Sequence, residues 1–435
     1  MGIKFKFIHT SDIHLGNVLH TCGSYYKEEF NKAPYNTLKY IFSYAIKNQI
    51  DFILISGDVF HSNGRSVLVD KYFYDVCKSI YPIKVYIVCG NHDPFQHKMN
   101  LFSHPENLYI FSSDKTECKE FYKDSKLVCR IIGQSYERVM ENRKIFKEYE
   151  KFAVIDGVYN ISMLHTQMEE SKSNYVPCSI TDLKKIKSVN YWALGHIHKF
   201  NILMDEERVI SYCGTPQGFD FKDQGIKGVN VIEVDENLKA KVKFLCTSSV
   251  IWNKLNLNLW DENIENIFDI ENLLLIKIEM YIDSIKYREL KGIKVINEIS
   301  KIYILKIIVY GIDNEFLNDK EEDIEKYIKD NLNDNLFNKN IKAYIEDICI
   351  IGCNKKRYKE FKEHNIYKKI EYFFNLCHYN EKLKKEIKRS LGKIWSQENL
   401  GMVHENRFLL TEEDYKLILE KAFKSIEGKF LEGSD

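Results

Sequence analysis

The stretch VCGNHDPF, residues 88–95, joins the end of an apolar run to an amide, an imidazole and a carboxylate, and a proline follows. The run IKVYIV at 83–88 has the length and the β-branched content of a buried strand, and the proline prevents regular structure from continuing. Asn91, His92 and Asp93 therefore lie at a strand end, where binding and catalytic residues gather in α/β proteins. This strand end is predicted to carry a functional site.

The same arrangement occurs at four other strand ends in the N-terminal part of the chain. Short apolar runs such as KFKFIHT and DFILISGD alternate there with helical patterns, which predicts an α/β layered sheet. The carboxyl ends of strands in such a sheet line one crevice, so we expect the polar residues after them to converge. The segments are HTSDIHLG with Asp12 and His14, SGDVFH with Asp58 and His61, CGNHD with Asn91, His92 and Asp93, MLHTQ with His165, and LGHIHK with His196 and His198.

The number and type of these side chains predict a pair of metal ions. Two aspartates, one asparagine and four histidines would meet, whereas one tetrahedral zinc needs only three or four ligands. Two ions that share a carboxylate need about this many ligands. Mixed imidazole, carboxylate and amide oxygen ligands suit manganese, iron or zinc, and manganese is the expected ion.

A pair of metal ions predicts phosphoester hydrolysis. Two ions can stabilise both the attacking and the leaving oxygen of an in-line displacement at phosphorus, and a hydroxide held between them would be the nucleophile. His92 follows Asn91 but is free to meet the substrate, and we expect Asp93 to orient His92 by accepting its second N–H. An isolated D-x-H or H-x-H pair would carry a high false-positive risk, and Asp58 alone could merely end its strand, so the prediction rests on five ordered strand ends.

The composition is that of a folded protein without a strong overall charge. Apolar residues make up 44% and charged residues 29% of 435 residues, so two or three domains are expected. The 63 basic and 63 acidic side chains cancel, so an anionic partner must be bound locally. Eleven cysteines without a CxxC pair favour reduced thiols and a cytoplasmic protein. We expect neither a secretory signal nor a membrane span, because no apolar stretch is long enough.

Three domains are predicted along the chain. All six prolines precede residue 229, which favours a loop-rich α/β domain over residues 1–250. A small α+β domain is expected over 251–350. Amphipathic helices are expected over 351–435, where a basic stretch begins near Lys355.

Several elements are expected within these domains. In the first domain, helices are expected at about 34–49 and 68–80, and the strands YNISMLHT and VNYWALGH are expected to extend the same sheet. In the second domain, LLLIKIEMYI, YILKIIVYGI and IKAYIEDICI are interpreted as strands, with a charged helix at about 320–331. An acidic helix is expected at about 411–427.

The strand-end segments resemble those of calcineurin-like metallophosphoesterases. HTSDIHLG, GDVFH, GNHD, the His165 strand end and GHIH occur in that family's order over about residues 5–230, and they are most similar to the SbcD-type DNA-repair exonucleases. The resemblance implies a layered sandwich of β-sheets flanked by helices, followed by a small α+β capping domain. It also implies C-terminal helices that dock on an SbcC-type coiled-coil ATPase, and a homodimer formed through the catalytic domain.

The resemblance also implies a role for each site residue. His92 would protonate the leaving oxygen or stabilise charge in the transition state, and His61 would assist it. The implied ligands are Asp12, His14, Asp58 and His198 for one metal and Asp58, Asn91, His165 and His196 for the other, with Asp58 bridging.

Two of the segments favour the nuclease branch over the protein phosphatases. Serine/threonine protein phosphatases usually continue as GD-x-x-D-R and have GNHE, whereas this chain has GDVFHS and GNHD. The glycine-rich GTPQGFDFKDQGIKG at 214–228 resembles the segment that closes the SbcD-type catalytic domain, although a plain loop and hairpin would explain it equally well.

These features together predict a metal-dependent DNA phosphodiesterase, an exonuclease that acts with an ATPase partner. One alternative is a phosphoesterase for nucleotides or other small phosphoesters, and another is a non-catalytic subunit that binds DNA or an ATPase. The basic helix near Lys355 could contact DNA phosphates or an acidic coiled coil, or it could be an ordinary solvated helix.

Overall fold

The computed structural model describes residues 3–19, 21, 25–95, 102–152, 154–168, 174–204, 208–285, 293–317 and 320–390, together with 415, 416, 418–420, 422, 423 and 426. The chain forms two compact units. The first unit comprises Met1–Lys254, Ile282–Leu305 and Ile341–Glu346, and the second comprises Leu255–Tyr281, Lys306–Asn340 and Asp347–Asp435.

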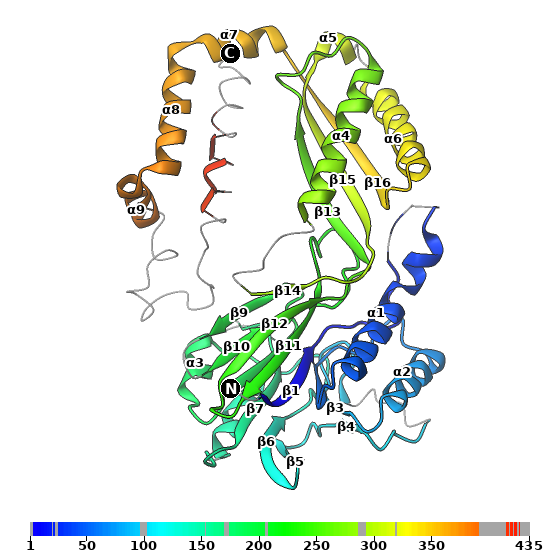
Figure 1. Cartoon of the computed structure of the whole chain (residues 1–435), viewed down its shortest axis with the longest axis vertical. Helices are drawn as coiled ribbons and strands as arrows, with labels where there is room; N and C mark the ends of the chain where they lie inside the picture. The colour runs from blue at the N-terminus through cyan, green and yellow to red at the C-terminus, as the bar shows by residue number, and fades with distance from the viewer. Residues whose placement is uncertain are drawn as a thin grey trace. The chain divides into compact units, whose positions relative to one another are not determined.

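Two stacked β-sheets form the centre of the first unit (Figure 1). The first sheet has the strand order β14-β12-β11-β1-β2-β3-β4, in which β1 to β4 are parallel and β11 is antiparallel to β1. Its strands are β1 (Ile3–Thr10), β2 (Phe52–Ser56), β3 (Lys84–Val88), β4 (Leu108–Ile110), β11 (Gly228–Asp235), β12 (Ala240–Cys246) and β14 (Val295–Ile296).

The second sheet has the order β5-β6-β7-β8-β10-β9, and β6, β7 and β8 are parallel. The prediction that YNISMLHT and VNYWALGH extend the first sheet is therefore wrong, because they form β7 and β8 here. Alternating strands and turns along a sequence do not specify to which of two layers a strand belongs. The strands are β5 (Glu117–Lys123), β6 (Lys126–Gly133), β7 (Tyr159–His165), β8 (Tyr191–Gly195), β9 (Asn201–Met204) and β10 (Val209–Tyr212).

The central strands are buried on both faces because their side chains alternate between two apolar layers. On β1 and β2, Phe7, Phe52 and Leu54 point between the two sheets, whereas Ile8 and Ile53 point to the other face. The inner layer is rich in aromatic side chains, and the rings of Phe7 and Phe52 stack at 5.3 Å. This double burial fixes the register of the strands and hence the positions of the residues that follow them.

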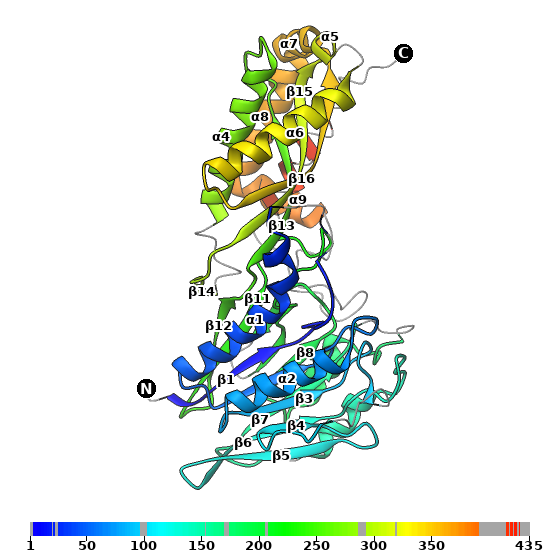
Figure 2. The same cartoon turned by 90° about the vertical axis from the view of Figure 1, so that its right-hand side faces the viewer.

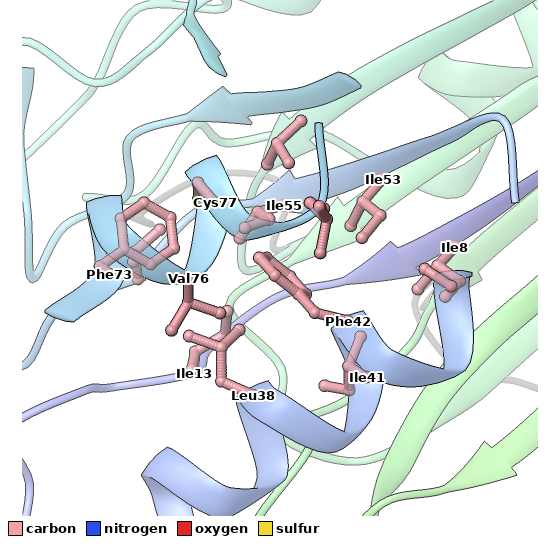
Figure 3. Close-up of a cluster of buried hydrophobic side chains, with 14 of the residues drawn as sticks. Ile8, Ile13, Leu38, Ile41, Phe42, Ile53, Ile55, Phe73, Val76 and Cys77 are labelled. Atoms are coloured by element: carbon pink, nitrogen blue, oxygen red, sulfur yellow. The ribbon is translucent and has the colours of Figure 1, made fainter. Parts of the chain in front are cut away.

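Two helices, α1 (Lys27–Lys47) and α2 (Val67–Ser79), lie side by side over the outer face of the first sheet (Figure 2). Figure 3 shows Leu38, Ile41 and Phe42 of α1 packed with strand residues such as Ile53 and Ile55. The first unit also contains the 3-10 helix Ile145–Lys151 and α3 (Ile180–Lys185).

The structure confirms the helix expected at about 68–80, but α1 begins earlier than the expected start at Pro34. The burial of Phe30 and Ala33 in one cluster with Trp252 stabilises the additional turns. This burial compensates for the loss of one helical hydrogen bond, because Pro34 has no backbone N–H to donate.

A third sheet has the order β13-β15-β16, formed by β13 (Val250–Asn258), β15 (Ile302–Asp313) and β16 (Ala343–Cys353). YILKIIVYGI and IKAYIEDICI are therefore strands, as expected. LLLIKIEMYI is not a strand, since it lies within α4 (Ile267–Ile285). Ile270, Leu274 and Ile278 are fully buried at intervals of four residues, so the run is the apolar face of a helix.

The other helices are α5 (Asn314–Leu317), α6 (Glu321–Asn338), α7 (Lys355–Glu363), α8 (Asn365–Tyr379) and α9 (Glu381–Ser390). Thus the charged helix expected at about 320–331 is α6, and the basic stretch folds as α7 to α9. The acidic helix expected at about 411–427 lies largely outside the described residues. Among the described helices, none has the length and apolar content required to span a membrane.

Candidate metal centre

The structure brings together polar side chains from the ends of five strands, β1, β2, β3, β7 and β8. Asn91 follows β3, and its Oδ1 lies 3.0 Å from His165 Nε2 at the end of β7 and 3.1 Å from His196 Nδ1 after β8. His14 follows β1, and its Nε2 lies 3.1 Å from His198 Nε2. The seven side chains predicted as ligands therefore form one cluster, in which most members are buried.

Asp12, His14 and His198 form the first ligand group, in which one potential ligand atom from each lies within 4.8 Å of the others. Two histidines bound to one ion at about 2.0–2.1 Å with tetrahedral geometry have nitrogens roughly 3.3 Å apart. The 3.1 Å approach of His14 Nε2 to His198 Nε2 is close to that value. The group is thus arranged as ligands of a common cation would be.

Asn91, His165 and His196 form the second ligand group. His196 Nδ1 lies 3.3 Å from His165 Nε2, and both nitrogens face Asn91 Oδ1. This set of two imidazoles and one amide oxygen suits a first-row transition metal.

Asp58 lies between the two groups. Its Oδ2 is 3.9 Å from His14 Nε2 in the first group and 3.5 Å from His165 Nε2 in the second. The other carboxylate oxygen, Oδ1, accepts a hydrogen bond from the backbone N–H of His92 at 2.8 Å. This position fits a carboxylate shared by two ions.

The backbone at the centre is held in an uncommon conformation. Asp12, His14, Asp58 and His196 have φ values of 51°, 49°, 53° and 97°, in the left-handed region. Each such residue costs of order 1–3 kcal/mol and persists only when its surroundings enforce it. Backbone hydrogen bonds from Asp12 N to Gly57 O and from His14 N to Asp58 O, both at 3.0 Å, hold the first two strand ends together.

Glycine is required where these chain segments approach each other most closely. Gly57 has a φ of 97°, and a Cβ added there would lie 2.1 Å from His165 Nδ1. At Gly90 an added Cβ would lie 2.3 Å from Asp58 Oδ1. The glycines of SGD and CGNHD therefore make room for two of the site residues.

Hydrogen bonds on the far side of two histidine rings fix which nitrogen faces the cluster. His165 Nδ1 lies 2.9 Å from the backbone oxygen of Ser56, so its N–H donates there and Nε2 is left for a cation. His198 Nδ1 lies 3.1 Å from Asp223 Oδ1, which turns its Nε2 toward His14. Both arrangements raise the basicity of the nitrogen that faces the cluster.

Burial controls the protonation of the cluster. It raises the pKa of Asp58 well above the usual value, and the charges of Asp93 and Asp12 add to the effect. It lowers the pKa of His14 and His165 far below the usual value and that of His196 to about 4. These imidazoles are therefore neutral at pH 7, which is the form that binds a metal.

The donor set fits two divalent cations. Cations would balance the buried carboxylates of Asp12 and Asp58. Each ligand group supplies two imidazoles, and in each group one of them, His198 or His165, is oriented by a hydrogen bond on the far side of its ring. The chemistry of the ligands does not distinguish manganese from iron or zinc.

His92 and His61 form a partly exposed pair beside the first ligand group. Their rings stack with centroids 5.4 Å apart, and one nitrogen of each lies within 4.8 Å of a nitrogen of His14. His92 Nδ1 lies 3.1 Å from the hydroxyl of Ser62. Burial lowers the pKa of His92, and the neighbouring His61 and His198 lower it further.

The expectation that Asp93 orients His92 is wrong. Asp93 Oδ2 accepts hydrogen bonds from the backbone N–H groups of Val59 and Phe60 at 2.7 and 3.2 Å, and Oδ1 accepts one from Gly90 N at 2.8 Å. The Asp93 carboxylate therefore links the loop after β2 to the loop after β3. The hydroxyl of Ser62, not Asp93, contacts the His92 ring. Adjacency in sequence was misleading because successive side chains in a tight turn point in different directions.

Three further residues at the centre were missed from the sequence. Asp223 contacts His198, Ser62 contacts His92, and the ring of Tyr175 lies 4.7 Å from that of His196. Asp223 lies in the glycine-rich stretch that the sequence singled out, but nothing in that stretch indicates which side chain reaches the cluster. Ser62 directly follows the SGDVFH segment.

Comparisons with known proteins agree with this description. Residues 5–200 match the model of the calcineurin-like phosphoesterase family. The uncharacterized metallophosphoesterase YhaO of Bacillus subtilis is 30% identical over 262 residues, which cover 58% of this chain and 63% of YhaO. The DNA double-strand break repair protein Mre11 of Methanocaldococcus jannaschii is 25% identical over 254 residues, which cover 53% of this chain and 63% of that protein. The chain thus spans less than two thirds of the length of these relatives.

Among solved structures, a dimetal phosphatase from Danio rerio matches 56% of this chain and 96% of its own, with a TM-score of 0.37 and 10% identity.

The family match, the two-sheet sandwich and the ligand cluster all point to the calcineurin-like phosphoesterases. The fold is the α/β metallophosphatase sandwich with an additional small sheet and C-terminal helices. Residues 5–200 are similar to the calcineurin-like phosphoesterases, and this stretch contains all seven predicted ligands, from Asp12 to His198.

Proposed function

We propose that the protein is a metal-dependent DNA phosphodiesterase that acts as an exonuclease rather than only as an endonuclease. The observation that carries this proposal is the stacked His61–His92 pair beside the first ligand group. In the nuclease branch that the sequence resembles, a histidine in the place of His61 assists the catalytic histidine. The similarity to a protein named as an Mre11 DNA double-strand break repair protein supports the same substrate class.

The ligand cluster and His92 would have separate tasks in this reaction. Two bound divalent cations would polarise the phosphate and lower the pKa of water. His92 would then protonate the departing sugar oxygen, since it is half-buried and next to the cluster but is not needed in either ligand group. Ser62 would hold the His92 ring through Nδ1, which leaves Nε2 for the substrate.

The direct test is cleavage by the purified chain with Mn²⁺. End-labelled single-stranded and double-stranded linear DNA should be shortened progressively, and a covalently closed circular DNA, which has no ends, serves as the endonuclease substrate. Hydrolysis of nucleotides without any action on DNA would support the small-phosphoester alternative. Two bound ions without hydrolysis of any phosphodiester would support the non-catalytic binding subunit.

We further propose that α8 docks an SbcC-type coiled-coil ATPase. Tyr367 and Phe374 on one face of α8 contact Phe423, whereas Tyr372, Phe373 and Tyr379 are 63%, 59% and 85% exposed. Exposed aromatic side chains next to lysines suit an acidic helical partner. Co-purification of the chain with a coiled-coil ATPase should be lost in Phe373→Asp and kept in a variant of an exposed lysine on α6, Lys326→Asp.

A cytoplasmic location and a homodimer formed through the catalytic domain stay predictions. The ten described cysteines carry thiols rather than disulfides, which supports a reducing compartment. Cell fractionation checks the location, and light scattering of the purified chain checks the dimer.

A further inference from the structure

We propose that Asp223 is a positioning residue for one metal site only, because it orients His198 and so sets the affinity of the first ligand group while leaving the second group unchanged. The proposal deepens the metal-dependent function and rests on the cluster binding two cations. It does not depend on DNA being the substrate.

The supporting observation is that a single loop, residues 213–227, contacts every member of the first ligand group. Thr215 Oγ1 donates to the backbone oxygen of Asp12 at 2.8 Å, and the ring of Phe219 meets that of His14 edge-on at 5.9 Å. His198 has three contacts with the loop: its Nδ1 with Asp223 Oδ1 at 3.1 Å, and its backbone oxygen with Lys227 Nζ at 3.0 Å and Thr215 N at 3.2 Å.

Asp223 is itself held in place. Its side chain is buried, Oδ2 accepts a hydrogen bond from Phe219 N at 3.2 Å, and Lys227 Nζ lies 3.7 Å from Oδ1. A carboxylate fixed at both oxygens can determine the orientation of the imidazole that it contacts. It therefore selects Nε2 of His198 as the atom that faces His14.

The second ligand group is supported by other parts of the chain. The Nδ1 of His165 bonds to the backbone of Ser56 at the end of β2, and Tyr136 OH donates to the backbone oxygen of His165 at 2.7 Å. Asn91 follows β3. The two groups are linked through the backbone N–H of His196, which donates to the Asp12 carboxylate at 3.0 Å. Among the described contacts, Asp223 meets His198 and no member of the second group, so a change at Asp223 should reach the second group only weakly.

Loss of a side chain that orients a metal-bound histidine typically costs about 10- to 100-fold in metal affinity. We expect Asp223→Ala to bind one Mn²⁺ with the affinity of the unchanged protein and the other ion about 10- to 100-fold more weakly. Asp223→Asn keeps an acceptor oxygen but loses the charge, so its loss should be smaller. Asp220→Ala is the matched control, since Asp220 lies on the same loop and the one described hydrogen bond of its side chain is with Lys222 N.

The experiment is calorimetric titration of the full chain with Mn²⁺, combined with metal analysis after gel filtration and without any substrate. The assignment to one site is tested with His165→Ala, which removes a ligand of the second group. If Asp223 acts on the first group, the double variant should bind neither ion with the affinity of the unchanged protein, whereas each single variant should still bind one ion with that affinity.

Two results would overturn the proposal. One is an Asp223→Ala protein that binds both ions as tightly as the Asp220→Ala control. The other is a double variant that still binds one ion with the affinity of the unchanged protein, which would assign Asp223 and His165 to the same site. If Asp223→Ala does not fold by circular dichroism, Asp223→Asn is titrated in its place, and affinity equal to the control again overturns the proposal. A failure to cleave DNA affects none of these readouts, so it would count against the nuclease proposal alone.

Discussion

The two ligand groups are held in different ways. His165 of the second group ends β7 and Asn91 lies in the turn after β3, and the backbone oxygen of Ser56 at the end of β2 orients His165. The first group depends on side chains of the 213–227 loop, above all Asp223 and Thr215. The difference shows that one group depends mainly on strand ends and the turns after them, whereas the other also needs a loop that is distant in the sequence.

The largest effect on metal binding and activity is expected at Asp58, which lies between the two ligand groups. Asp58→Ala should remove both ions and lower phosphodiesterase activity by about 10³-fold or more, equivalent to about 4 kcal/mol, because Asp58 approaches both ligand groups. Metal analysis and hydrolysis of bis(p-nitrophenyl) phosphate measure the two losses. Asp75→Ala, which removes an exposed carboxylate on α2, is the control. Retention of one tightly bound ion would show that Asp58 serves only one group.

A change at His92 should separate metal binding from proton transfer. His92→Ala should retain both ions but lose about 10²- to 10⁴-fold in rate, as expected for loss of a general acid. Ser62→Ala should lose only about 5-fold, since it removes one hydrogen bond of about 1 kcal/mol to the ring. Full activity of His92→Ala with both ions bound would exclude His92 from the reaction.

A third change tests the role of strand-end packing in the second group. Gly57→Ala should lower the free energy of unfolding by about 2–4 kcal/mol, because its Cβ would clash with His165 and its φ of 97° disfavours a side chain. Gly157→Ala is the matched control, since its φ is 70° but nothing lies within 4 Å of the added Cβ, and it should cost only about 1 kcal/mol. Urea denaturation compares the two variants, and equal losses would mean that the clash with His165 is relieved cheaply.

The smallest effect is expected in the loop that supports the first group. Thr215→Val removes the hydroxyl that donates to the backbone of Asp12, and it should lower the free energy of unfolding by about 1 kcal/mol. The affinity for one of the two ions should fall slightly, and the affinity for the other should not change. Equal weakening of both ions in a Mn²⁺ titration would contradict the separation between the two groups.

The same comparison explains which parts of the site were predictable from the sequence. His165 ends β7 and Asn91 follows β3, both strands have strong burial patterns, and such patterns specify both the strand and the edge at which it ends. Asp223 is 25 residues from His198, and its contact depends on the path of a loop that no periodic pattern describes. Asp93 was misassigned for the same reason, because the direction of a side chain in a turn depends on local geometry.

The prediction of the fold from the sequence has a similar limit. The parallel strands around β1 follow from short apolar runs, but the division of the strands between two sheets does not, as β7 and β8 show. The run at 273–282 was interpreted as a strand because a continuous apolar stretch suits a buried strand and a buried helix equally well. The helical conformation of this run becomes the more stable one only when the surrounding helices and sheet pack against it.

The distance along the chain between the members of the first ligand group has a consequence for biosynthesis. His14 and His198 are 184 residues apart, and Ile8 of β1 pairs with Val231 of β11, beyond the supporting loop. At synthesis rates of 5–20 residues per second, a ribosome would need roughly 10–40 s to pass from one histidine to the other. During that interval the nascent polypeptide contains only some of the residues of the first ligand group. The first ligand group thus cannot bind its cation with all of its supports until the 213–227 loop has emerged and β11 can pair with β1.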